Sequence, residues 1–92
     1  MDTQLKGKVA VITGGSVGIG LAVAQGLAAE GVDVAIIARD GERAHARAAE
    51  INAAYGVRTL GVAADVSRAD ECDRAVAEIL HAFGGVDILI NN

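Results

Sequence analysis

The chain has 92 residues, a net charge of −4, 52% hydrophobic residues and 2% aromatic residues, so it forms one domain at most. The acidic balance and the scarcity of aromatic side chains argue against nucleic acids and anionic membranes as partners. The single cysteine, Cys72, excludes an internal disulfide, and we expect no metal site. The first eight residues have no long apolar run, and no segment reaches the roughly 18 apolar residues of a membrane span. We therefore expect no signal peptide, no membrane partner and a cytoplasmic location.

Short apolar segments rich in Val and Ile alternate with longer segments of helical periodicity along the whole chain. The short segments predict strands over residues 8–13, 33–38, 58–63 and 87–91. They lack a regular alternation of polar and apolar residues, which is typical of strands buried on both faces. Strands that are separated by helices predict right-handed crossovers and a parallel sheet, and hence an α/β fold.

Three segments between these strands have apolar residues at helical spacing. The expected buried stripes are Ile19, Ala22, Val23, Gly26 and Leu27 in the first helix, Ala44, Ala48, Ile51 and Tyr55 in the second, and Cys72, Val76, Ile79, Leu80 and Phe83 in the third. Tyr55 and Cys72 are accordingly interpreted as core residues. Asp40 is expected to cap the second helix, and Ser67 with Asp70 resembles a capping box for the third.

The most informative segment is the glycine-rich loop Thr13-Gly14-Gly15-Ser16-Val17-Gly18-Ile19-Gly20, which lies between the first strand and the first helix. A pyrophosphate needs a turn tight enough to bring it to a helix N-terminus, where unpaired amides and the helix dipole attract anions. Gly14 would turn the chain off the strand, Gly18 would let the backbone approach the phosphates, and Gly20 would let the helix lie close to the sheet. Ser16 would add a hydroxyl donor.

Any tight turn uses glycine, so the glycines alone are weak support for a nucleotide site. Their position after a strand and before a helix, at the start of a strand–helix–strand unit, favours phosphate binding over a purely structural turn. The spacing differs from G-x-x-x-x-G-K-[ST], and no lysine follows, which argues against a nucleoside-triphosphate loop.

The spacing T-G-x-x-x-G-x-G resembles that of the short-chain dehydrogenase/reductase family, in its one-domain branch. Two further motifs match at suitable distances: Asp65-Val66 follows the third strand, and Asn91-Asn92 ends the fourth. The resemblance covers the chain from about Gly7. It implies a partial Rossmann-type doubly wound sheet, with strand order 3-2-1-4 in chain numbering. It also implies an oxidoreductase that moves hydride between a nicotinamide cofactor and a carbonyl or hydroxyl substrate.

Carried over residue by residue, the resemblance implies roles in cofactor binding but none in catalysis. The expected cofactor-binding residues are Gly14, Ser16, Val17, Gly18, Ile19 and Gly20 along the pyrophosphate and nicotinamide side, Arg39 at the ribose, Asp65 and Val66 at the adenine, and Asn92 at the nicotinamide-side ribose. Asn91 is expected to brace the sheet. The family's active-site Asn, Ser, Tyr and Lys lie further along than residue 92, and Tyr55 has no lysine four residues after it.

The end of the second predicted strand bears on the choice between NADP and NAD. An NAD site usually has a carboxylate at the strand end, where this chain has Ala38, and the next residue is Arg39. A guanidinium there would pair with the 2′-phosphate of NADP. Two residues favour NAD instead: Asp40 lies 20 positions after Gly20, where a ribose-binding acid is often found, and Val17 stands where NADP-preferring relatives often carry Arg or Lys. We expect NADP as the favoured cofactor, with NAD as the alternative.

The sequence thus predicts that residues 1–92 are the N-terminal, dinucleotide-binding half of a single Rossmann domain whose catalytic half is absent. The chain alone is expected to be inactive, with a small-molecule substrate bound only by the full-length enzyme. One alternative is a non-catalytic nucleotide-binding fragment or folding module. A sugar-nucleotide epimerase or a methyltransferase would use the same fold, but the three motifs disfavour both. An open fourth strand predicts self-association or marginal stability, and we expect a homo-oligomer.

Overall fold

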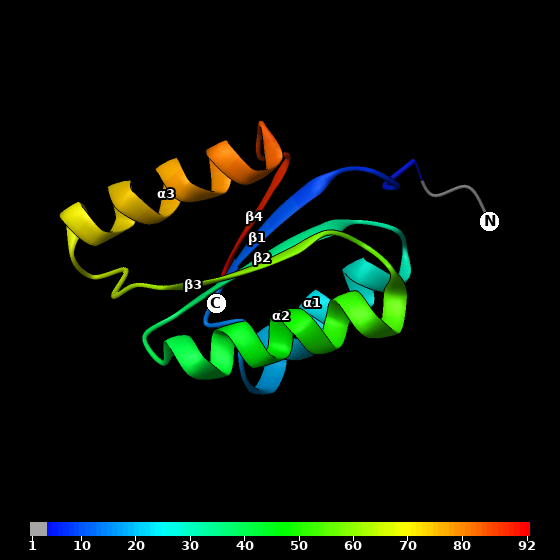
Figure 1. Ribbon diagram of the computed structural model, residues 1–92, viewed down its shortest axis with the longest axis horizontal. Coiled ribbons are helices and arrows are strands. Elements are labelled where there is room, and N and C mark those ends of the chain that lie inside the picture. The colour runs from blue at the N-terminus through cyan, green and yellow to red at the C-terminus, as the bar shows by residue number, and fades with distance from the viewer. Residues whose placement is uncertain (1–3) are drawn as a thin grey trace.

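Four parallel strands form the centre of the computed structural model, which describes residues 4–92 (Figure 1). They are β1 (Val9–Thr13), β2 (Asp33–Ala38), β3 (Thr59–Ala63) and β4 (Ile88–Asn91), and they pair in the order β3-β2-β1-β4. The predicted α/β class and strand order are therefore confirmed. Part of the N-terminal segment for which no signal peptide is expected, residues 1–3, lies outside the described residues.

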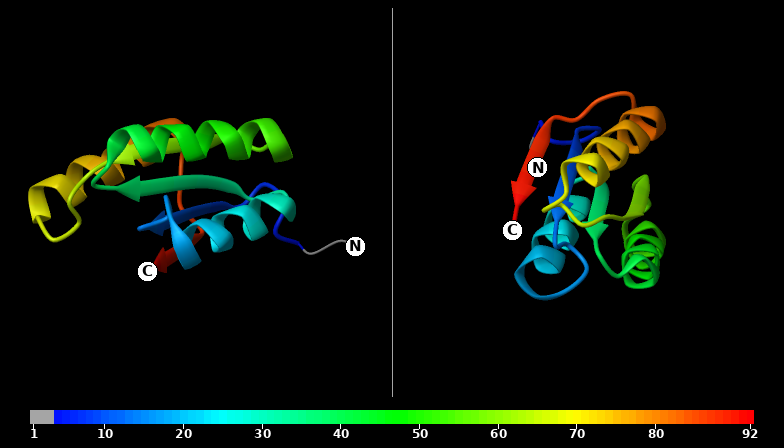
Figure 2. Two further views of the ribbon diagram at one scale, coloured as in Figure 1. Left: turned by 90° about the horizontal axis from the view of Figure 1, so that it is seen from below. Right: turned by 90° about the vertical axis from the view of Figure 1, so that its left-hand side faces the viewer.

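Each connection between consecutive strands contains one helix. The helices are α1 (Gly18–Ala29), α2 (Gly41–Tyr55) and α3 (Ala69–Phe83). α1 and α2 lie on one face of the sheet and α3 lies on the other, as the two figures show from three directions (Figures 1 and 2). Within residues 4–92, no helix is long and apolar enough to cross a membrane.

The sheet is buried on both faces because successive side chains of a strand point to opposite sides. Ile12 and Ile36 pack with the buried alanines of α1 and with α2, whereas Val11 and Ile37 pack with the α3 side. Both cores consist almost entirely of the side chains of Ala, Val and Ile. The expectation of strands covered on both faces is confirmed for β1 and β2, the two central strands.

The buried face of α1 differs from the predicted stripe. The buried residues are Gly20, Ala24 and Ala28. Of the predicted stripe, Leu27 is partly buried and packs against the core, whereas Ile19 is 77% exposed. The prediction followed the larger apolar side chains, but α1 lies so close to the sheet that only the smallest residues fit beneath it. A spacing of four residues between Gly20, Ala24 and Ala28 forms that narrow contact line.

Two other core predictions are wrong. Tyr55 is 44% exposed because it is the last residue of α2 and Gly56, with φ +71°, turns the chain away directly after it. Cys72 is only partly buried and its Sγ donates to the carbonyl of Val66.

On α3, Ala75 and Ile79 are the buried residues, whereas Val76 and Leu80 are exposed. α3 contacts only one sheet face, so the outer part of its wide apolar stripe has no neighbour among residues 4–92. The predicted capping box is also absent: no side chain caps α3, and the Ser67 hydroxyl donates to Asp65 instead.

Candidate functional site

A cleft of about 520 Å³ lies where the carboxyl ends of the strands meet the loops that follow them. Its lining residues come from all four strand ends and from the start of α2: Thr13, Gly14, Ser16, Val17, Ile37, Ala38, Arg39, Asp40, Arg43, Ala64, Asp65, Val66, Ser67 and Asn92. In open parallel sheets, ligands bind at the carboxyl ends of the strands. The site lies between two neighbouring strands whose connecting helices lie on opposite faces of the sheet. Here the neighbouring strands are β1, which continues into α1 on one face of the sheet, and β4, which follows α3 on the other face.

The loop between β1 and α1 is shaped by two glycines with different functions. Gly14 has φ +66°, a backbone conformation that favours glycine, and its amide donates to the Ile37 carbonyl at 2.8 Å. A Cβ on Gly20 would collide with the Gly14 carbonyl and would lie 2.8 Å from Asn92 Nδ2. The close approach expected at Gly20 is therefore present, and it packs the first turn of α1 against the end of β1.

The N-terminus of α1 has the properties of an anion site. Its N-cap is Val17, which offers no side-chain cap, and its first turn contains no acidic residue. The free amides and the positive end of the helix dipole therefore lack a carboxylate of their own. An anion such as a phosphate would satisfy these groups.

The ends of β1 and β4 are joined through Thr13. Its Oγ1 lies 3.1 Å from Asn91 Oδ1, and it accepts a hydrogen bond from the Asn92 amide at 3.1 Å. Asn92 Nδ2 also donates to the Gly14 carbonyl at 3.4 Å. These contacts hold Asn91 at the sheet and put Asn92 in the cleft wall beside the glycine loop.

Three charged residues of the cleft lining follow β2: Arg39, Asp40 and Arg43. Asp40 caps α2, as predicted, by accepting the Arg43 amide at 3.1 Å, and its carboxylate pairs with the Arg43 guanidinium at 3.8 Å. Arg39 is exposed in the cleft wall, and no ion pair in the described part of the chain occupies its guanidinium. Asp40 is thus engaged by the helix that it caps, while Arg39 is available for a ligand.

Asp65 and Val66 lie at the third strand end, in the loop between β3 and α3. Asp65 Oδ1 accepts hydrogen bonds from the Ser67 hydroxyl at 2.6 Å and from the Ser67 amide at 3.0 Å. These two bonds are the main cause of a lowered pKa at Asp65, and the charge of Arg39 contributes further. Asp65 is therefore a carboxylate, and a hydrogen-bond acceptor, at neutral pH.

The cleft gathers most of the residues that the sequence predicts for cofactor binding. Its lining includes Gly14, Ser16, Val17, Arg39, Asp65, Val66 and Asn92, whereas Gly18, Ile19 and Gly20 lie outside it. Sequence reasoning missed Arg43 and Ser67 as cleft residues. Arg43 could have been found from the predicted cap at Asp40, because the residue three positions after a cap lies in the first turn of the helix beside it. Among residues 4–92 no group of His, Cys, Asp and Glu is arranged to hold a metal ion.

The fold and the position of the cleft define the chain as a Rossmann-type α/β protein. The model of the short chain dehydrogenase family matches residues 8–92. The chain belongs to this family, which confirms the resemblance seen in its three motifs.

Two solved structures and one curated relative, each named as a reductase or a dehydrogenase, illustrate what the chain is similar to. L-sorbose reductase from Gluconobacter frateurii, solved in complex with NADPH and L-sorbose, is 48% identical with a TM-score of 0.95 over 100% of this chain and 35% of its own. A short chain dehydrogenase from Burkholderia cenocepacia J2315, solved in complex with NADP, is 47% identical with a TM-score of 0.88 over 98% of this chain and 37% of its own. The 3-oxoacyl-(acyl-carrier-protein) reductase FabG of Aquifex aeolicus is 42% identical over 100% of this chain and 37% of its own length. The chain thus spans about a third of the length of these relatives.

Proposed function

We propose that this chain is the cofactor-binding part of a short chain dehydrogenase that uses NADP(H) in preference to NAD(H). The observation that carries the choice of cofactor is the end of β2, where Ala38 stands in place of a carboxylate and the Arg39 guanidinium lines the cleft. NADP differs from NAD by a 2′-phosphate, for which a guanidinium is the best-suited protein ligand. The NADP(H) complexes of two similar structures support the same choice.

The proposal assigns residues in and beside the cleft to each part of the dinucleotide. The pyrophosphate would lie at the amides of Gly18, Ile19 and Gly20 that begin α1, with Ser16 and Val17 beside it. Arg39 and Arg43, which both line the cleft, would hold the 2′-phosphate.

The two ends of the dinucleotide have their own groups. Asp65 and Val66 would contact the adenine, and Asn92 the nicotinamide-side ribose. When bound, the nicotinamide ring supplies the chemistry, since it accepts or donates a hydride. The residues of this chain bind and orient the cofactor.

The parent enzyme would transfer hydride between this cofactor and a carbonyl or hydroxyl substrate. The 92 residues supply no catalytic group for that reaction, because the one tyrosine, Tyr55, lies at the end of α2 and is not part of the cleft lining. The chain alone is then inactive, and its substrate is bound only by the full-length protein. A cytoplasmic location and a homo-oligomeric parent complete the proposal.

A second candidate function is a nucleotide-binding or folding module that associates with itself. The observation in its favour is the open edge at β4 (Figure 2). The side chain of Leu89 on this strand is 67% exposed. Exposed apolar strand edges pair with other chains. The two candidates make different predictions: the second requires that the chain associates with itself even at a saturating concentration of dinucleotide.

Calorimetric titration of the chain with two pairs of ligands tests the proposal. NADPH and NADH test the whole cofactor, while 2′,5′-ADP and 5′-AMP differ only by the 2′-phosphate. A hydrogen-bonded charge pair contributes about 1.5–3 kcal/mol, so we expect about ten- to a hundredfold tighter binding of the 2′-phosphorylated member of each pair. Equal affinities would reject the NADP preference, and no binding of any dinucleotide to the folded chain would reject the site.

A further inference from the structure

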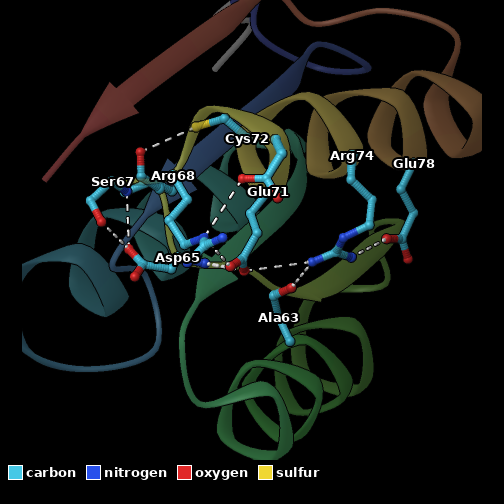
Figure 3. A network of polar contacts seen from close by, with 10 residues as sticks. Ala63, Asp65, Ser67, Arg68, Glu71, Cys72, Arg74 and Glu78 are labelled. Carbon is cyan, nitrogen blue, oxygen red and sulfur yellow. Dashed lines mark hydrogen bonds and ion pairs between the residues drawn. The ribbon is translucent and has the colours of Figure 1, made fainter.

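The loop that carries Asp65 and Val66 is held by residues of the first turn of α3. Figure 3 shows Glu71 extending from α3 toward Asp65, with Ser67 and Arg68 around them. Glu71 Oε1 accepts the Asp65 amide at 2.9 Å, across six residues of chain. The Arg68 amide donates to the Asp65 carbonyl at 3.0 Å. Both backbone polar groups of Asp65 are therefore bonded before any ligand arrives.

The Asp65 side chain is oriented by the same loop. Its Oδ1 accepts two hydrogen bonds from Ser67, whereas no described residue donates to its Oδ2. A carboxylate has room for about four hydrogen bonds, so Oδ2 is free to accept one from a ligand. Because Asp65 lines the cleft, that acceptor is available to a group bound there.

We infer that Glu71 is a positioning residue that sets the adenine selectivity of the cleft, by fixing the Asp65 backbone so that the free Asp65 carboxylate oxygen meets the 6-amino group of the base. The inference rests on the proposed function, since it requires a bound adenine dinucleotide. Glu71 does not line this cleft. It lines an adjoining hollow of about 410 Å³, which shares Arg39, Ala64 and Asp65 with the cleft, and we assign it the role of holding the Asp65 amide.

The other contacts of Glu71 offer a competing explanation, in which only its charge matters. Glu71 Oε2 lies 3.3 Å from Arg68 Nε, and Oε1 lies 4.0 Å from an Arg74 amino nitrogen. Both arginine side chains are more than half exposed, so these ion pairs are screened and weak. The hydrogen bond to the Asp65 amide is shorter and comes from a fixed backbone donor. The geometry therefore indicates that the length of the Glu71 side chain, rather than its charge, is what holds the Asp65 amide.

Two conservative variants separate reach from charge. Glu71→Gln keeps an acceptor oxygen at the same reach but loses the charge, whereas Glu71→Asp keeps the charge but is shorter by one methylene. The probes are NADPH and its analogue with hypoxanthine in place of adenine, which has no 6-amino group. Selectivity is measured as the ratio of their dissociation constants, alongside the thermal midpoint of each variant.

Wild type is expected to prefer NADPH by about tenfold, the effect of one hydrogen bond to a charged group. Glu71→Gln should keep that preference, and Glu71→Asp should reduce it to about threefold or less. The matched controls are Glu78→Gln and Glu78→Asp on the same helix, since the Glu78 carboxylate pairs with Arg74 and lies away from the Asp65 loop, and both should leave the ratio unchanged (Figure 3). The reverse order of the two Glu71 variants, or no preference in wild type, would overturn the inference.

Amide exchange without any ligand tests the same contact separately from cofactor binding. The Asp65 amide should exchange about tenfold or more faster in Glu71→Asp than in Glu71→Gln, because only the longer side chain reaches it. Equal exchange rates would overturn the inference while leaving the proposed function intact. If the two variants differ in exchange rate as expected but the wild-type chain binds no dinucleotide, the proposed function is rejected, and the inferred selectivity with it.

Discussion

Arg39 and Asp40 are neighbours with opposite charges. Asp40 is already bonded within the chain, whereas the Arg39 guanidinium is accessible to a ligand in the cleft. Asp40 is engaged as the cap of α2 and as the ion-pair partner of Arg43. Arg39 lines the cleft with no such partner among residues 4–92. An acidic residue near the ribose site would repel a 2′-phosphate, but a carboxylate already bonded to its own helix has part of its charge offset. Arg39 therefore offers an anionic ligand a positive charge that no ion pair within residues 4–92 engages, while it also acts on the Asp65 carboxylate.

The first prediction concerns this guanidinium. Arg39→Ala should weaken NADPH binding by about ten- to a hundredfold, because a charged hydrogen-bond pair is lost, and should change NADH binding by less than about threefold. Lys8→Ala is the matched control, since it removes one positive charge from an exposed side chain at the amino end of β1. Calorimetric titration measures both effects. An equal loss for NADPH and NADH would contradict the assignment of Arg39 to the 2′-phosphate.

A second prediction concerns the ionisation of Asp65. The Ser67 hydroxyl and amide favour the charged carboxylate and lower the pKa of Asp65 below its ordinary value of 3.8. A lowered pKa in the folded state contributes stability that is complete above pH 3.8 and is lost as the pH falls through the lowered pKa.

Ser67→Ala removes the stronger of the two bonds, so the pKa of Asp65 should rise toward its ordinary value. NMR titration of the Asp65 carboxyl carbon follows this change directly. An unchanged titration in the variant would show that the hydroxyl does not stabilise the carboxylate.

At the scale of the elements, α1 combines a close approach to the sheet with the glycine loop at its start. The contact line of Gly20, Ala24 and Ala28 allows this approach, and it brings the helix N-terminus to the end of β1. Gly26 belongs to the same helix but faces open space, and a Cβ added there would meet nothing within 4 Å. Gly20 and Gly26, two of the three glycines of α1, should therefore respond in opposite ways to substitution by alanine.

Alanine at each position tests this difference. Gly20→Ala should destabilise the chain by about 1–3 kcal/mol, since its Cβ would collide with backbone of the loop. Gly26→Ala should stabilise it by about 0.5–1 kcal/mol, because glycine in a helix interior carries an entropic cost. Urea denaturation of both variants gives the two free energies of unfolding. Destabilisation of the same size at both positions would contradict the packing difference between them.

At the scale of the whole molecule, the two faces of the sheet are covered unequally. α1 and α2 cover one face, whereas α3 alone covers the other, and β4 is an edge strand (Figures 1 and 2). Val76 and Leu80 on α3 and Leu89 on β4 are exposed apolar side chains. Exposed apolar surface beside an open strand edge favours association between chains.

The chain made alone should therefore self-associate at micromolar concentrations or unfold with low stability. Leu89→Lys should shift the population toward monomer, because a charge on an edge strand opposes pairing. Ala53→Lys, at an exposed position of α2, is the control and should leave association unchanged. Sedimentation equilibrium measures both. A wild-type chain that sediments as a clean monomer and melts cooperatively would refute the prediction.

The sequence by itself determined the order of the elements, the parallel sheet and the position of the glycine loop. These features follow from local periodicity and from the general rules of crossover connections, so residues close in the chain are sufficient to predict them. The strand order was implied only by the resemblance to a family, because periodicity does not say which strands are neighbours. The predicted strands of residues 8–13, 58–63 and 87–91 differ from the observed ones only in their first residues.

Only the tertiary structure decided which side chains are buried and which polar groups meet. The buried face of α1 depends on how closely the helix approaches the sheet, which composition does not reveal. The link from Thr13 to Asn92 joins residues 79 positions apart, and the bond from the Asp65 amide to Glu71 depends on where α3 begins. Such contacts arise from the three-dimensional meeting of segments, for which no local pattern in the chain provides a signal.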